Sequence, residues 1–262
     1  PMTHLPENPE EVRMPFSSHL EELRKRLFRS LLIVGVLFMG GWMLLKPQLQ
    51  AIFIQPHKDA VAVLVENGHT MEDRLSILSA AEPVFFDLKV SLLAALLIGL
   101  PWVIWEIWSF IAVGLFPKER KVISSYIPFG LLSGVAGTLF GYFFMIPTVL
   151  RFLYEMVNPD LMVQAYRLSD YFSIFMMFTI ALALVFQLPL ILLGLGAAGL
   201  VDAKTLSKYR RHFILGAFVV AAMVTPPDPF SQALMAAPTI LLYELGILLV
   251  RLKAPSSLSD ET

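Results

Sequence analysis

Apolar stretches of about 20 residues alternate with short polar segments along most of the chain. A helix of this length crosses a hydrocarbon layer about 30 Å thick, so each stretch predicts a membrane span. The stretches run from about residue 27 to 45, 84 to 108, 122 to 153 and 171 to 195, and two shorter ones from 213 to 225 and 231 to 250. The pattern predicts an all-α polytopic membrane protein with six transmembrane helices, of which the fifth and sixth are short.

Composition agrees with this interpretation. Of the 262 residues, 56% are hydrophobic and 16% are charged, whereas soluble domains are about one quarter charged. The chain contains no cysteine, which excludes a disulfide framework and a thiolate metal site. We expect a single membrane domain over residues 1–262, with residues 1–14 and 254–262 as flexible tails, and no cofactor.

Basic residues gather in alternate loops and at both ends of the spanning region. By the positive-inside rule these segments face the cytoplasm, which predicts that both termini are cytoplasmic (N-in/C-in). The basic residues are Arg24, Lys25, Arg26 and Arg29 before the first span, Lys118, Arg120 and Lys121, then Lys204, Lys208, Arg210 and Arg211, and finally Arg251 and Lys253.

Two segments outside the spans also carry a pattern. Apolar residues at Phe16, Leu20, Leu23 and Leu27 share one helical face, which predicts a cytoplasmic amphipathic helix along the membrane surface. The long loop over 46–83 mixes apolar and polar residues at helix-like spacing. It is either a set of short interfacial helices that cap the outer face, broken at Pro56, or an ordinary ordered loop.

The first of these segments contains adjacent acids among its bases. Ser18 and Glu21 fit a capping box, which gives Glu21 a structural role. Glu22 has Arg26 one turn further on, and a surface pair of this kind stabilises a helix by about 0.5 kcal/mol. Local ion pairs and contacts with anionic lipid are therefore sufficient to explain these charges.

A further acid, Glu119, lies among bases in FIAVGLFPKERK (Phe110–Lys121), on the same predicted side as Glu22. Two carboxylates on one face suit a ligand with two guanidinium groups, because arginine pairs with a carboxylate through a bidentate fork that lysine cannot form. Spacing alone leaves open whether the two carboxylates converge.

Several ordered motifs resemble the TatC family, the signal-recognising core of the twin-arginine protein translocase. The resemblance covers about Pro15 to Arg251. The motifs are HLEELRKRL (His19–Leu27), WSFIAVGLFPKER (Trp108–Arg120), SDYFSIF (Ser169–Phe175), FQLPL (Phe186–Leu190), VTPPDPFSQ (Val224–Gln232) and YELGI (Tyr243–Ile247).

The resemblance implies a receptor in the bacterial cytoplasmic (inner) membrane, not an enzyme. Such a receptor binds twin-arginine signal peptides of folded cargo and organises the single-span subunits TatA and TatB, and further copies of itself, for export driven by the proton motive force. Its expected contacts also include membrane lipids but no nucleic acid.

The same resemblance implies roles for particular residues. Glu22 and Glu119 receive the paired arginines of the signal, and Arg24 and Phe110 match neighbouring positions of that site. Val113 stands where the family usually has proline, so this chain departs from the family pattern in the loop.

A second pair of matched positions concerns partner subunits. Thr225 and Gln232 correspond to family positions on the face where TatA and TatB dock.

Placing a polar residue inside an apolar stretch costs free energy unless the residue is paired or hydrated, so each such residue is a functional candidate. Gln187 stands where the family often has glutamate; an amide cannot titrate, and polar contact between helices explains it equally well. Pro189 predicts a kink near it. Glu244 lies in the sixth span, while Asp87 and Lys89, near the outer end of the second, favour an interfacial interpretation.

The fifth stretch is short for a span. Thirteen residues from Phe213 to Thr225 rise only about 20 Å as a helix, so neighbours must bury it or the bilayer must thin around it. Local thinning would lower the barrier to moving a folded protein across the membrane.

Other classes of membrane protein fit less well. A small-solute secondary transporter, the main alternative, usually shows interrupted spans in a repeated arrangement, which this chain does not. An intramembrane serine protease needs a histidine within the spans, but the histidines lie outside them or at their edges. A glycine-rich phosphate loop is also missing, which excludes a P-loop ATPase.

Overall fold

The structure, a computed structural model, describes residues 16–69, 71–113, 117–158, 165–197 and 199–253. For residues 16–19, 111–113, 117–125 and 253 it describes the backbone alone. Within these ranges the regular structure is helical, and an isolated β-bridge pairs Ser76 with Arg167.

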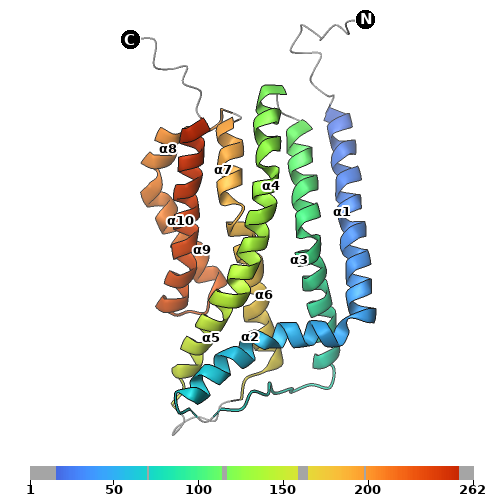
Figure 1. Cartoon of the computed structure of the whole chain (residues 1–262), viewed down its shortest axis with the longest axis vertical. Coiled ribbons are helices and arrows are strands. Elements are labelled where there is room, and N and C mark those ends of the chain that lie inside the picture. Colours follow the sequence, from blue (N-terminus) through green and yellow to red (C-terminus); the bar gives the residue numbers. More distant parts are fainter. Residues whose placement is uncertain (1–15, 70, 114–116, 159–164, 198, 254–262) are drawn as a thin grey trace, which may run out of the picture.

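The helices form an elongated bundle in which α1 begins and α10 ends at the same end (Figure 1). The elements are α1 (Phe16–Leu44), α2 (Lys46–Glu66), α3 (Glu82–Val113), α4 (Pro117–Phe140), a π-helical turn η1 (Gly141–Met145), α5 (Ile146–Glu155), α6 (Leu168–Val185), α7 (Leu188–Ala197), α8 (Ala203–Lys208), α9 (Arg210–Val224) and α10 (Pro229–Lys253).

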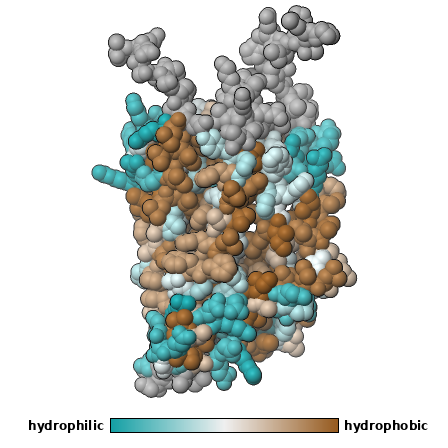
Figure 2. Space-filling view, in the orientation of Figure 1, coloured by the Kyte–Doolittle hydropathy of each residue, from teal (hydrophilic) through white to brown (hydrophobic). Residues whose placement is uncertain are grey.

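Five helical segments among the described residues are long and apolar enough to cross a membrane. Hydrophobic residues cover the middle of the face seen in Figure 2, and hydrophilic ones gather toward both ends. The prediction of an all-α membrane protein is thus confirmed. The segments are Leu20–Leu44, Glu82–Phe110, Tyr126–Glu155, Leu168–Ala197 and Pro229–Leu252.

The last two predicted spans differ from one another. The prediction of a short sixth span is wrong, because α10 begins at Pro229, directly after the proline-rich turn, and continues for 25 residues. Helix α9 has 15 residues and rises only about 22 Å. Its crossing of the membrane, and with it the total of six spans, stays a prediction.

The predicted surface helix at the N-terminal end is wrong. Helix α1 runs without interruption from Phe16 to Leu44, since this stretch contains no proline and its glycines all lie in its second half. Ser18 lies inside this helix and not at its N-cap, so the capping-box interpretation is wrong too. Glu21 pairs instead with Lys25, at 2.9 Å.

Helix α2 lies across the end of the bundle opposite to the start of α1 and the end of α10, as the prediction of a cap required (Figure 1). The predicted break at Pro56 is wrong, because α2 continues through it. Proline leaves the carbonyl four residues earlier, that of Ile52, without its helical donor. The hydroxyl of Tyr142, on η1, donates to this carbonyl at 2.8 Å and compensates for the loss.

Asp87 joins this cap to α3. Its carboxylate is 4% exposed and contacts the Lys46 ammonium and the Gln50 amide, both on α2. The interfacial interpretation of Asp87 is therefore wrong, because the residue is buried and paired. Lys89 is exposed and lies 5.9 Å from the ring centre of Phe172, which agrees with an interfacial position.

The predicted kink near Pro189 is confirmed. Helix α6 ends at Val185 and α7 begins at Leu188. At the break, the hydroxyl of Ser133 on α4 donates to the carbonyl of Phe186 at 2.5 Å. This contact gives a hydrogen-bond donor to a carbonyl at the break between the two helices, where the helical hydrogen-bond pattern is interrupted.

Candidate functional site

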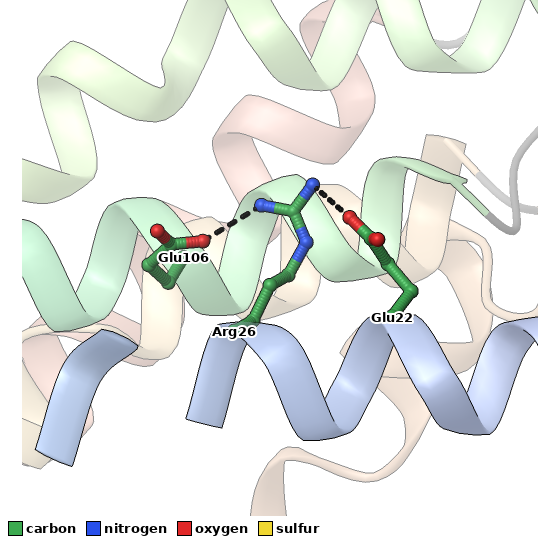
Figure 3. A network of polar contacts seen from close by, with 3 residues as sticks. All are labelled: Glu22, Arg26 and Glu106. Carbon is green, nitrogen blue, oxygen red and sulfur yellow. Dashed lines mark hydrogen bonds and ion pairs between the residues drawn. The ribbon is translucent and has the colours of Figure 1, made fainter. Parts of the chain in front are cut away.

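The most connected ionic group in the described residues lies between α1 and α3, near the end of the bundle where α1 begins (Figure 3). One nitrogen of the Arg26 guanidinium, Nη2, lies 2.6 Å from Oε1 of Glu22. The other, Nη1, donates to Oε2 of Glu106 at 2.8 Å. Arginine therefore bridges two carboxylates, one from each helix.

The local part of this arrangement follows from helix geometry. Glu22 and Arg26 are four residues apart on α1, the spacing at which side chains of one face meet. The pair predicted from sequence is thus confirmed. The third member comes from α3, which packs along α1 and brings Glu106 to the guanidinium from 80 residues away in the sequence.

Exposure increases from one end of the group to the other. The side chain of Glu106 is 6% exposed, that of Arg26 is 17% exposed and that of Glu22 is 32% exposed. A buried carboxylate needs a charged, hydrogen-bonded partner to offset its desolvation, and Arg26 supplies it for Glu106. Glu22 is the carboxylate that a ligand from solution can reach.

Glu106 is the residue that sequence reasoning missed. The sequence did contain an indication, since Glu106 is an acid within the apolar run WVIWEIWSF of the second span. An ionisable residue inside a span is a functional candidate. The pattern alone did not indicate its partner, since Arg26 lies on another helix.

The other residues predicted for signal binding lie at the same end of the bundle. Arg24 is exposed on α1, and Phe110 is half-buried near the end of α3. The backbone of Glu119 lies in the first turn of α4, whose N-terminal end is at this end of the bundle (Figure 1), but its side chain is outside the described residues, as is that of Val113. Convergence of Glu22 and Glu119 therefore stays a prediction.

Gln187 lies at the break between α6 and α7 and is 9% exposed. Its amide Nε2 donates to the carbonyl of Gly130 on α4 at 3.1 Å. This contact supports the interpretation of Gln187 as a polar contact between helices. Within a membrane span, where water is scarce, a side-chain amide can satisfy a polar group of a neighbouring helix.

Glu244 is not buried. Its carboxylate forms a two-pronged pair with Arg210, from Nε at 2.7 Å and from Nη2 at 2.8 Å. Both side chains are more than 40% exposed, so the pair joins the start of α9 to α10 at the surface and contributes little to stability.

Thr225 and Gln232 flank the turn between α9 and α10. Thr225 ends α9 and is 7% exposed. The Gln232 amide donates to the carbonyl of Phe218 on α9 at 2.9 Å. The structure thus brings the two predicted partner-docking residues to one hairpin turn, away from the end of the bundle where α1 begins (Figure 1).

Comparison with known proteins agrees with this arrangement. The family profile described as "Sec-independent protein translocase protein (TatC)" matches residues 18–238. Sec-independent protein translocase protein TatCy of Bacillus subtilis is 31% identical over 238 residues, which cover 90% of this chain and 89% of that protein. TatC of Helicobacter pylori is 32% identical over 243 residues, covering 93% of this chain and 90% of that protein.

The fold agrees with a solved structure as well. A crystal structure of the twin-arginine translocase receptor TatC superposes with a TM-score of 0.71 at 29% identity, covering 89% of this chain and 98% of that chain. The match of the profile extends over most of the chain, and it includes both α1 with its charged pair and the α9–α10 turn. This chain therefore belongs to the TatC family of Sec-independent, twin-arginine protein translocases.

Proposed function

We propose that this chain is the signal receptor and core subunit of a twin-arginine translocase, and that it binds the signal peptides of folded cargo through Glu22 and Glu119. The observation that carries the proposal is the position of Glu22. Its carboxylate is one-third exposed at 32% and receives only one nitrogen of Arg26, at 2.6 Å.

A carboxylate has two oxygens and about four acceptor sites. With Arg26 using one terminal nitrogen on Oε1, acceptor capacity remains for an incoming guanidinium. A charge-assisted hydrogen bond of this kind contributes about 1.5–3 kcal/mol. Phe110 and Arg24, at the same end of the bundle, are proposed to contact the residues around the arginine pair.

The proposed orientation places this end of the bundle in the cytoplasm of a bacterium, where a newly made signal arrives. The basic residues that gather at the chain ends and in alternate loops support it. The proposal extends to export of folded cargo driven by the proton motive force, and to assembly with further copies of the chain.

The α9–α10 turn is proposed to receive the single-span partners TatA and TatB. Thr225 and Gln232 flank the turn between the short helix α9 and α10, where a neighbouring helix can complete the packing. A photocrosslinker at Gln232 should capture a single-span partner in membranes and leave peptide affinity unchanged. Loss of peptide binding in that variant would contradict separate sites.

The test of signal binding measures peptide affinity of the full chain in nanodiscs at fixed ionic strength. The probe is a synthetic peptide with an adjacent arginine pair followed by an apolar segment, compared with the same peptide carrying a lysine pair. We expect Glu22→Gln and Glu119→Gln each to weaken binding of the arginine peptide by about ten- to a hundredfold.

Glu21→Gln is the matched control, because Glu21 is the adjacent acid and pairs on the surface with Lys25. It should leave the affinity within about twofold, as expected for an exposed pair. Equal losses in Glu21→Gln and Glu22→Gln, or a silent Glu119→Gln, would show that the two-carboxylate site is wrong.

A further inference from the structure

Glu106 lies beside the proposed signal site, although no role has been assigned to it above. We propose that Glu106 is a positioning residue: it holds Nη1 of Arg26 and balances the charge of that guanidinium, so that the charge of Glu22 remains available to the signal arginine. The inference rests on the proposed function and adds to it a residue that does not touch the ligand.

The first support for this proposal is the geometry of Arg26. A guanidinium beside a single carboxylate pairs with both of its oxygens through two parallel hydrogen bonds. Arg210 does this with Glu244 in the same chain, at 2.7 and 2.8 Å. Arg26 contacts Glu22 through Nη2 alone and leaves its Nε without a hydrogen-bond partner, while its Nη1 donates to Glu106 at 2.8 Å (Figure 3). The guanidinium is therefore shared between two carboxylates.

The second support is the net charge of the three side chains. Two carboxylates share one guanidinium, so the group of three has a net charge of −1. Glu22 and Arg26 without Glu106 would form a neutral pair, which attracts a further cation weakly. Since Glu106 is 6% exposed and Glu22 is 32% exposed, the excess negative charge is available to a ligand at Glu22.

The third support is the burial of Glu106. Interactions between charges strengthen as water is excluded, so the nearly buried Glu106 competes well for Arg26 against the more exposed Glu22. Glu106 and Glu22 also come from different helices, and the packing of α3 along α1 fixes the separation between them. The charge of the built-in arginine is thereby balanced at Glu106, and Glu22 keeps negative charge for the signal arginine.

The test compares Glu106→Gln with the double variant Glu106→Gln/Arg26→Gln in the full chain. Glutamine keeps an acceptor oxygen for Nη1 but cannot balance its charge, so the charge of Arg26 should neutralise Glu22 instead. We expect Glu106→Gln to bind the arginine-pair peptide about tenfold more weakly, the cost of about one charge-assisted hydrogen bond. The double variant, which lacks the competing guanidinium, should return to within about threefold of the original affinity.

Asp87→Asn is the matched control. It removes another buried carboxylate of α3 that is paired with a cation, Lys46, but at the end of the bundle near α2. Its affinity for the arginine peptide should be unchanged. Both glutamine variants should elute as folded protein, since neither leaves a buried carboxylate without its cation.

The outcomes separate the two proposals. If the original chain binds the arginine and lysine peptides equally, the proposed function is wrong and this inference falls with it. If the original chain prefers arginine and Glu106→Gln binds as tightly, then only the inference is wrong. If the double variant binds the arginine peptide as weakly as Glu106→Gln does, the inference is also wrong, and Glu106 only links α1 to α3.

Discussion

The close approach of α4 to the break between α6 and α7 makes a quantitative prediction. A methyl group at Gly137 would lie 2.6 Å from Cγ, 2.8 Å from Cβ and 2.9 Å from Cδ2 of Phe186. All three distances are shorter than carbon atoms tolerate. Because Cβ is attached to the backbone, rotation of the side chain cannot relieve the contact, and one of the helices must move.

Gly137→Ala therefore forces extra volume into a packed helix interface, which costs about 1–3 kcal/mol. Replacing glycine by alanine within a helix also stabilises it, by about 1 kcal/mol. Gly35→Ala is the control for this gain, because Gly35 lies within α1 and a methyl group there meets nothing within 4 Å. The difference between the two variants isolates the contact with Phe186.

The assay is unfolding of the full chain in mixed micelles by increasing denaturing detergent, followed by circular dichroism. We expect Gly137→Ala to be less stable than Gly35→Ala by about 1–3 kcal/mol. A difference below about 0.5 kcal/mol, the usual effect of a surface substitution, would refute the reasoning. It would mean that α4 can move away from Phe186 without a loss of stability.

Two further predictions concern the cap formed by α2 and the orientation of the chain. Burial lowers the pKa of His57 on α2, so the unfolded chain takes up this proton more readily. Stability from this residue is thus complete above about pH 6.5 and decreases as the pH falls below it. His57→Gln should reduce the difference in unfolding midpoint between pH 7.5 and 5.5, and an unchanged difference would contradict the assignment. For orientation, single cysteines at Asn67 and at Ser256, which lies outside the described residues, should label from opposite sides of sealed vesicles; labelling from one side would exclude six spans.

Much of the architecture was predictable from local sequence. Membrane spans depend on long apolar runs, and those runs are visible without a fold, as α3 and α10 show. The kink before Pro189 follows from the chemistry of proline, and the pair between Glu22 and Arg26 follows from helical spacing. Each of these features depends on residues that follow one another within a single stretch of the sequence.

Tertiary contacts decided the features that were predicted wrongly or missed. Helix α2 continues through Pro56, and the hydroxyl of Tyr142, 90 residues from Ile52, donates to the carbonyl that this proline leaves free. Asp87 is buried because Lys46 and Gln50 of the cap meet it. Local sequence alone specifies neither partner.

The same distinction applies to the candidate site. The sequence by itself determined that Glu22 and Arg26 share a face of α1, because the helix repeat places them one turn apart. Only the packing of α1 against α3 decided that Arg26 also meets Glu106 and so shares its charge between two carboxylates. Side-chain charge is encoded residue by residue, but the sharing of a charge between helices depends on how those helices approach each other.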